Sequence, residues 1–283
     1  MSAPTTQPML RLRTQWENLR AGWNRVGVQT LFYGKTLTSV ADVLRHYRVE
    51  VLRLIAQMSL GTGALAIIGG AVVIIGFLTL SAGAVLAVQG YNSLSGIGVE
   101  ALTGFISAYV NVRIAAPLVA GIGLAATIGA GATAQLGAMR INEEIDALEV
   151  MGVRSIAYLA SSRLIAGVVV VIPLYCVAVV MSFLSARFAT TAVYGQSTGV
   201  YDHYFGTFLN WTDLIWSFLQ AIAMAVVVML VHTYYGFNAS GGPAGVGEAV
   251  GRAVRTSLIC AVLVTLFVSL AIYGQSGNFN LSG

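Results

Sequence analysis

The densest group of chemically active side chains in this 283-residue sequence is acidic. Four of its eleven carboxylates fall within seven positions, at Glu143, Glu144, Asp146 and Glu149. Asn142 is suited to cap a helix there, the carboxylates suit the positive end of the helix dipole, and Gly152 is suited to end the helix. The spacing therefore predicts a short charged helix of about nine residues, roughly 13 Å long.

This predicted helix has an apolar face as well as a charged one. Ile145, Leu148 and Met151 fall on the same side, and the carboxylates cover the rest. A helix this short cannot span a membrane. It is either a solvated connector that covers the ends of neighbouring helices, or a knob inserted into a groove of a partner protein. Periodicity alone does not separate these two interpretations.

Three further patterns resemble chemical sites but lack what the chemistry requires. Gly34-Lys35-Thr36 resembles the end of a nucleotide-binding loop, but that motif needs Gly at position 29, where this chain has Gln. The Gly-rich stretch 129–134 lies within an apolar run, where small residues favour close helix packing. Three histidines are too widely separated to predict a site: His46, His203 and His232. We therefore expect no enzyme, no bound cofactor and no metal site in this chain.

The elements that position the acidic segment are membrane spans. The sequence is 57% hydrophobic and 9% charged, with a mean hydropathy of +0.80, whereas a globular domain carries roughly 25% charged residues. A span needs about 20 apolar residues. Four uncharged runs each fit one span: Ile114–Met139, Leu164–Ala186, Leu214–Gly247 and Thr256 to the C-terminus. We therefore expect an all-α membrane protein.

A fifth run, Leu54–Val99, could hold one span with an interfacial piece, or two spans. With one span, a single side of the membrane receives thirteen of the fifteen Lys and Arg residues, and only Arg113 and Arg187 fall on the other. Two spans would divide them ten against five. The positive-inside rule therefore favours five spans, with the N-terminus in the cytoplasm and the C-terminus outside.

Residues 1–58 are predicted to form a basic N-terminal segment before a five-span domain at 59–283. Five apolar residues recur at helical spacing: Leu12, Trp16, Leu19, Trp23 and Val26. This pattern indicates an amphipathic helix in the cytoplasmic interface, or a cytosolic helix packed on another subunit. The first ten residues lack the apolar core of a signal peptide. Topology explains the +4 net charge, so we expect no nucleic-acid binding.

The acidic segment resembles the signature of the MlaE/YrbE permeases, the membrane subunits of ABC-type lipid transporters. The family pattern is approximately A-E-L-G-x-M-R-x-x-E-Q-I-D-A-L-E-x-M-G-V. This chain fits it in register at Leu136–Arg140, Glu143, Ile145–Glu149 and Met151–Val153. Further similarity lies at Gly83–Tyr91, Pro117 and Gly241–Arg255. The resemblance therefore covers most of the chain.

The resemblance implies a complex in the inner membrane. Two permeases would form a dimer above two cytoplasmic ATPases, which bind ATP and Mg²⁺, and below an extracytoplasmic assembly of MCE-domain proteins that carries lipid or fatty acid. The acidic helix near 142–152 would be the coupling helix that rests in an ATPase groove. Its coupling residues would be Glu143, Glu144, Ile145, Asp146, Leu148, Glu149 and Met151.

The chain departs from the family pattern at two places in the second span. Gln135 stands where the family has Glu, and Ala126-Thr127 replace a Gly-Arg pair. This loss of charge favours one of two non-identical permeases, a heterodimer, over a homodimer. Such pairs occur in the Mce complexes of actinobacteria, and this chain resembles their B-type member.

Polar residues within the spans are the candidates for a lipid pathway, namely Gln89, Tyr91 and Gln135. Hydrogen bonding between helices explains them equally well. An ion-coupled carrier would keep ionisable side chains in its spans, where this sequence has almost none beyond His232. A non-transporting scaffold would have no use for an acidic coupling helix. The residues specify neither the lipid nor the direction of transport.

Overall fold

The computed structural model describes residues 23–24, 26–60 and 70–273, and the regular elements in that part of the chain are all helical. Five helical stretches are long and apolar enough to cross a membrane. They are Gly70–Ser95, Glu100–Ile141, Ile156–Val193, Trp211–Phe237 and Gly242–Ile272. The predicted all-α fold with five spans is therefore confirmed. Within its described part, the run Leu54–Val99 holds one candidate span.

Two of the spans are built from several helical pieces. The first span is α5 (Gly70–Ser95). The second joins η1 (Glu100–Leu102), α6 (Thr103–Val110), η2 (Asn111–Ala115), α7 (Ala116–Leu124), η3 (Ala125–Gly129) and α8 (Ala130–Ile141). The third joins η4 (Ile156–Ser161), α10 (Ser162–Phe188) and η5 (Ala189–Val193). The fourth is α12 (Trp211–Phe237), and the fifth lies within α13 (Gly242–Tyr273).

The pieces meet at turns of π-helix, which η2, η3, η4 and η5 form. A π-turn adds a residue to the α-helical repeat, so it rotates the side chains that follow it around the helix axis. Such turns occur frequently at functional sites. The side of the helix on which a repeating set of residues lies therefore changes along the second and third spans.

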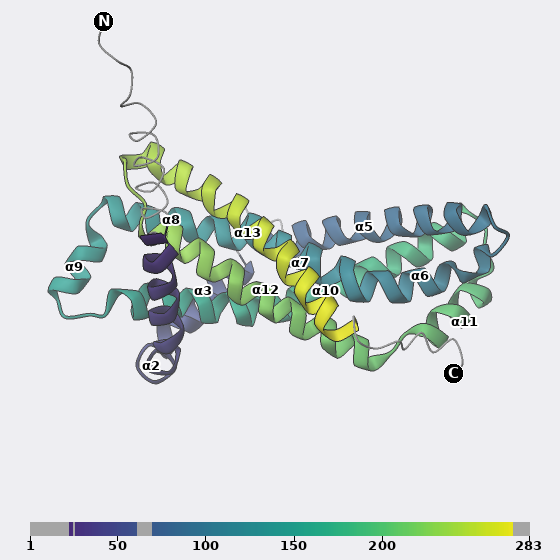
Figure 1. Ribbon diagram of the computed structural model, residues 1–283, viewed down its shortest axis with the longest axis horizontal. Coiled ribbons are helices and arrows are strands. Elements are labelled where there is room, and N and C mark those ends of the chain that lie inside the picture. Colours follow the sequence, from purple (N-terminus) through teal and green to yellow (C-terminus); the bar gives the residue numbers. More distant parts are fainter. Residues whose placement is uncertain (1–22, 25, 61–69, 274–283) are drawn as a thin grey trace, which may run out of the picture.

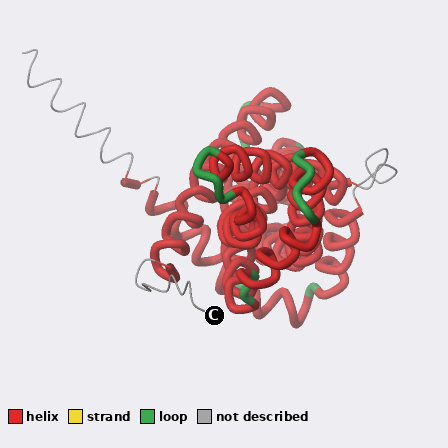
Figure 2. The backbone as a smooth tube through the Cα atoms, turned by 90° about the vertical axis from the view of Figure 1, so that its right-hand side faces the viewer, coloured by secondary structure: helices red, strands yellow, loops and turns green. Residues whose placement is uncertain are grey.

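The spans run along the long axis of the molecule, and short helices mark its two ends (Figure 1). At one end, α9 (Glu144–Val150) connects the second span to the third, and α13 begins near it. At the other end, α11 (Thr198–Phe208) connects the third span to the fourth. Viewed along this axis, the spans pack side by side as a bundle (Figure 2).

Small residues allow α5 and α10 to approach closely. Gly76 and Gly83, seven positions apart on α5, are buried and face α10. A Cβ atom at Gly83 would lie 2.4 Å from the Ser182 carbonyl oxygen. The main apolar core lies on this side of α10, around Ile75, and continues to α7 and α12. Close contact of this kind is how spans associate in lipid.

The described part of the N-terminal segment packs onto the α9 end of the bundle. Residues 26–38 are helical, and α2 (Val40–His46) and α3 (Arg48–Leu60) follow. Phe32 is buried, with its ring 5.5 Å from that of Tyr234 in α12. Tyr33 lies beside it, and burial raises its pKa to about 12. Trp23 and Val26 are exposed, and the predicted positions Leu12, Trp16 and Leu19 lie outside the described residues.

The spans contain more ionisable groups than the uncharged runs predicted, because the helices extend beyond those runs. Arg113 in η2 pairs with Asp213 in the first turn of α12 at 2.7 Å, and its guanidinium lies 3.8 Å from the Tyr109 ring centroid. Arg163 in α10 is 6% exposed and donates to the Leu159 carbonyl. Arg113 and Arg163 each come directly before an uncharged run, so the runs themselves keep the predicted scarcity of ionisable side chains.

Candidate docking surface and apolar hollow

The acidic helix begins one residue later than the sequence predicted. Asn142 does not cap it, because α8 extends to Ile141 and Asn142 closes that helix, donating its backbone N–H to the Ala138 carbonyl. Glu143 then takes a left-handed conformation with φ of 60°, and α9 starts at Glu144. A non-glycine residue in this region is uncommon and costs about 1–3 kcal/mol. A sharp, strained turn therefore directs α9 away from α8.

The other end of α9 follows the sequence prediction, because Gly152 ends the helix with φ of +76°. Its N–H donates to the Glu149 carbonyl at 3.0 Å, and the N–H of Val153 donates to the Leu148 carbonyl at 3.0 Å. These two bonds form a Schellman motif, in which glycine adopts the left-handed conformation without a Cβ penalty.

The glycine at this turn gives a direct test of the cap. We expect Gly152→Ala to destabilise α9 by about 1–2 kcal/mol, because a Cβ atom is disfavoured at positive φ. Faster amide hydrogen exchange in residues 144–153 would report the loss. The matched control is Gly251→Ala, because a Cβ atom at Gly251 meets nothing within 4 Å and its φ is not positive. Equal exchange in both variants would contradict the role of Gly152.

The apolar face of α9 divides into a buried root and an exposed tip. Ile145 is fully buried in a cluster with Leu136 and Leu159, and Leu148 packs against the same cluster. Met151 is 68% exposed beside Val150, which is 89% exposed. The prediction that Met151 shares the face of Ile145 was therefore wrong, because Met151 lies at the C-cap, where the chain leaves the helix. Val150 was missed.

The carboxylates of α9 serve two purposes. Asp146 accepts a hydrogen bond from Arg140 at 2.6 Å, and Glu149 accepts one from the Ser155 hydroxyl at 2.5 Å. These contacts attach both ends of the helix to its flanking segments. Glu143 and Glu144 are exposed, and they place two negative charges at the N-terminal end of α9, opposite the apolar tip at its C-terminal end. The result is a projecting helix with a fixed base and a mixed acidic and apolar outer surface.

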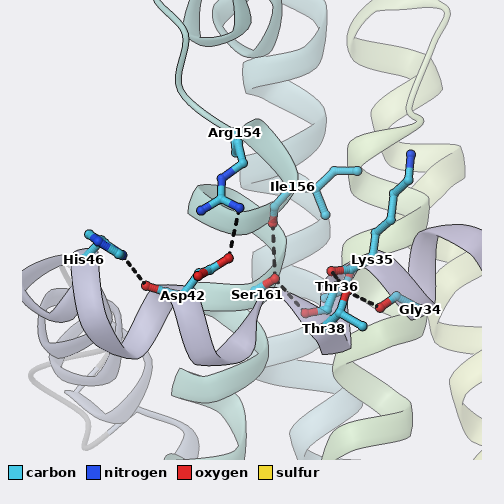
Figure 3. Close-up of polar contacts among 9 residues, drawn as sticks. All are labelled: Gly34, Lys35, Thr36, Thr38, Asp42, His46, Arg154, Ile156 and Ser161. Carbon is cyan, nitrogen blue, oxygen red and sulfur yellow. Dashed lines mark hydrogen bonds and ion pairs between the residues drawn. The ribbon is translucent and has the colours of Figure 1, made fainter.

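The N-terminal segment forms polar contacts, here called the clasp, with the chain that follows α9 (Figure 3). Arg154 donates to the Asp42 carboxylate of α2 at 2.9 Å. Deeper in the fold, the Ser161 hydroxyl donates to the Thr36 carbonyl at 2.8 Å, and Thr36 is fully buried. Gly34–Thr36 thus lies within a helix and not in a phosphate-binding loop. A recess of about 420 Å³ opens between this clasp and Glu149.

A second feature is a hollow of about 330 Å³ between α3, α5 and the η3–α8 segment. Gln135, Thr127 and Gly131 line it from one face of η3–α8, and Gln57 lines it from α3. The rest of the lining has no polar side chain: Leu54, Met58, Gly70, Ala71, Ile74, Ala126, Ile128 and Ala132. An apolar cavity with a few polar groups is typical of a small-molecule site. The role of Gln135 in a lipid pathway stays a prediction, and the structure places this residue in the lining of the hollow.

The structure does not bring the three predicted pathway residues together. Gln89 and Tyr91 lie near the C-terminal end of α5, at the α11 end of the molecule, whereas Gln135 lies in α8 (Figure 1). Gln89 is exposed and donates to the Ser93 hydroxyl at 3.3 Å. The ring of Tyr91 stacks on that of Tyr194, with 4.2 Å between centroids. Neither residue lines the hollow that contains Gln135.

Comparison with known proteins decides which family this architecture represents. The family model described as Permease MlaE matches residues 60–271, from the end of α3 through the fifth span. The chain belongs to the MlaE permease family. The match contains α9. It also contains the lining residues of the hollow that α5, η3 and α8 contribute, but not those of α3. It therefore covers the first four candidate spans in full and the fifth up to residue 271.

Individual proteins with permease names are similar to this chain over most of its length. A probable ABC transporter permease protein of Rickettsia bellii is 27% identical over 205 residues, covering 69% of this chain and 76% of that protein. One from Rickettsia felis is 24% identical over 87% of this chain and 95% of its own length. The intermembrane phospholipid transport system permease protein MlaE of Haemophilus influenzae is 23% identical over 68% and 74%. The chain is therefore a multi-pass membrane permease subunit.

Proposed function

We propose that this chain is the permease subunit of an ATP-driven lipid transporter of the Mce/Mla type, and that α9 is its coupling helix. The observation that carries the proposal is the shape of α9. Its root, Ile145, is buried, while its tip, Val150 and Met151, is exposed, and α9 itself lies at one end of the molecule (Figure 1). Motion of a partner that grips the tip would pass through the root into the second and third spans. ATP hydrolysis belongs to that partner.

The distribution of charge supports a cytoplasmic location for the α9 end. The Lys and Arg residues of this end include Lys35, Arg140, Arg154, Arg252 and Arg255, whereas Arg187 lies at the α11 end. Cytoplasmic loops carry the excess of Lys and Arg. This distribution favours an N-terminus in the cytoplasm and a C-terminus outside, where MCE-domain proteins would receive or deliver the lipid.

The exposed faces of the outer spans support assembly with a second permease. On α13 an apolar row faces away from the bundle: Ile259, Val262, Leu263, Leu266, Phe267 and Leu270. On α5, Phe77 and Val85 are 67% and 66% exposed. A second MlaE-type chain and lipid would share these surfaces. The uncharged residues Gln135 and Thr127 favour a non-identical partner.

The hollow lined by Gln135 is proposed as part of the lipid pathway. Gly131 lines it, and a Cβ atom there would meet nothing within 4 Å, so a larger side chain can enter the space without disturbing the fold. We expect Gly131→Leu to lower lipid transport about ten-fold, the change produced by about 1.4 kcal/mol of lost binding. ATPase binding should stay unchanged.

Gly251→Leu is the control for this prediction, because Gly251 also has open space beside it but lies outside the hollow. Transport of a fluorescent phospholipid between vesicles of defined composition measures both variants. If Gly131→Leu and Gly251→Leu transport equally well, the hollow is not in the pathway.

Purification of the intact complex from native membranes, followed by mass spectrometry, tests the proposed function. We expect an ABC-type ATPase, a second and different permease, MCE-domain proteins and a bound lipid. A preparation with a single permease species would contradict the heterodimer. A preparation without any ATPase, from membranes in which the chain is intact, would contradict the proposed function as a whole.

A further inference from the structure

A fully buried polar cluster connects three spans near the α9 end of the molecule. His232 of α12, Thr133 of α8 and Ser257 of α13 are each 0% exposed. The Nδ1 atom of His232 lies 2.8 Å from the Thr133 hydroxyl, and its Nε2 atom lies 3.1 Å from the Ser257 hydroxyl. One imidazole ring therefore connects α12 to both neighbouring helices at once.

Every polar side-chain group of this cluster can have a hydrogen-bond partner with a neutral ring. A neutral imidazole has one donor and one acceptor nitrogen, and each hydroxyl can donate or accept. Thr133 also lies 3.0 Å from the His232 carbonyl, and the Ser257 hydroxyl donates to the Val254 carbonyl at 2.9 Å. Whichever nitrogen carries the proton, both hydroxyls keep a partner. A buried network that is fully satisfied makes its contacts rigid.

Close packing gives the ring no alternative position. A Cβ atom at Gly129 would lie 2.5 Å from Cδ2 of His232, so only glycine leaves room for the imidazole there. One turn further along α12, a Cβ atom at Gly236 would lie 2.9 Å from the Thr133 carbonyl oxygen. The backbones of η3–α8 and α12 therefore approach closely on both sides of the hydrogen bond between Thr133 and His232.

The η3–α8 segment lies between this cluster and the hollow. Gly129 and Thr133, four residues apart, face α12. Thr127, Gly131 and Gln135, also at steps of four, line the hollow. Steps of four place residues on one side of a helix, so the two sets occupy different sides. The C-terminal end of α8 leads through two residues into α9.

We propose that His232 is a positioning residue that ties α8 to α12 and α13, so that displacement of α9 moves these three spans as one unit and reshapes the hollow. The inference rests on the proposed coupling role of α9. His232 touches neither the partner nor the hollow, because its contacts are with the neighbouring helices. Without the tie, α8 would yield to motion of α9 while α12 and α13 stayed in place.

The test replaces single hydroxyls and measures coupling, not folding alone. In the purified complex with its ATPase, Thr133→Val removes the tie to α8 and Ser257→Ala the tie to α13. Thr233→Val is the matched control, because Thr233 is equally buried on α12 but its hydroxyl bonds only within that helix, to the Met229 and Leu230 carbonyls. ATPase content, ATP hydrolysis and lipid transport are measured on each preparation.

We expect Thr133→Val to keep the ATPase and its hydrolysis but to lower the lipid moved per ATP by about five-fold or more, the lower end of typical coupling between sites. Ser257→Ala should lower it in the same direction, and His232→Gln, which keeps one donor and one acceptor, should recover part of the loss seen in His232→Ala. Equal coupling in Thr133→Val, Ser257→Ala and Thr233→Val would overturn the inference. Loss of the ATPase from the wild-type complex would instead contradict the proposed function.

Discussion

Placing aspartate at both exposed residues of the α9 tip, Val150→Asp with Met151→Asp, is expected to abolish binding of the ATPase to this chain. The two side chains are 89% and 68% exposed, so the fold should tolerate the change. In an apolar groove, however, each new carboxylate would be buried without a partner. Truncating a dominant interface residue costs at least about 2 kcal/mol, which is about thirty-fold in affinity, so two such changes should lower affinity about 700-fold or more.

The control for this prediction lies at the other end of the molecule. Val200 of α11 is 37% exposed, and Val200→Asp introduces one of the same carboxylates far from α9 (Figure 1). Co-purification of the ATPase with each variant measures the effect, and the melting temperature of the isolated chain checks the fold. If the double variant retains as much ATPase as Val200→Asp, the tip of α9 is not the contact.

The second large effect is expected from Gly83→Ala, which should destabilise the contact between α5 and α10. The added Cβ atom would lie 2.4 Å from the Ser182 carbonyl oxygen and 2.3 Å from the Ser185 hydroxyl oxygen. A backbone carbonyl cannot turn aside as a flexible side chain does, so the two spans must separate. Overpacking of this kind costs about 1–3 kcal/mol. We expect a lower melting temperature in detergent.

Gly76→Ala provides a graded comparison on the same face of α5. A Cβ atom at Gly76 meets Cγ1 of Val177 at 3.6 Å, which is ordinary van der Waals contact. Its effect on the melting temperature should be small. If Gly76→Ala and Gly83→Ala destabilise the protein equally, the close approach at Ser182 does not hold these spans together.

The number of spans and the position of the acidic helix follow from the sequence, because both depend on charge. The uncharged runs and the sidedness of Lys and Arg predict five spans, and the clustered carboxylates locate α9. The capping of α9 was harder to predict. Asn142 fits either the start of one helix or the end of another, and only the length of α8 decides that it ends α8.

The site residues depend on packing that sequence periodicity does not record. The π-turns at η2 and η3 rotate the side chains that follow them, so the faces of the second span cannot be assigned from a single helical period. Gln135 lines a hollow and Gln89 does not, although both are isolated glutamines in apolar runs. The partners of His232 lie 99 and 25 residues away in the chain, and only the packing of the spans brings them together.

The most direct test of the coupling role of α9 is a photo-crosslinking amino acid placed at Val150 in the intact cell. After irradiation, we expect crosslinks to a cytoplasmic protein that mass spectrometry identifies as an ABC-type ATPase, and no such product from the same amino acid at Val200. Crosslinks from Val150 to lipid alone, or ATPase crosslinks from both positions, would contradict the account.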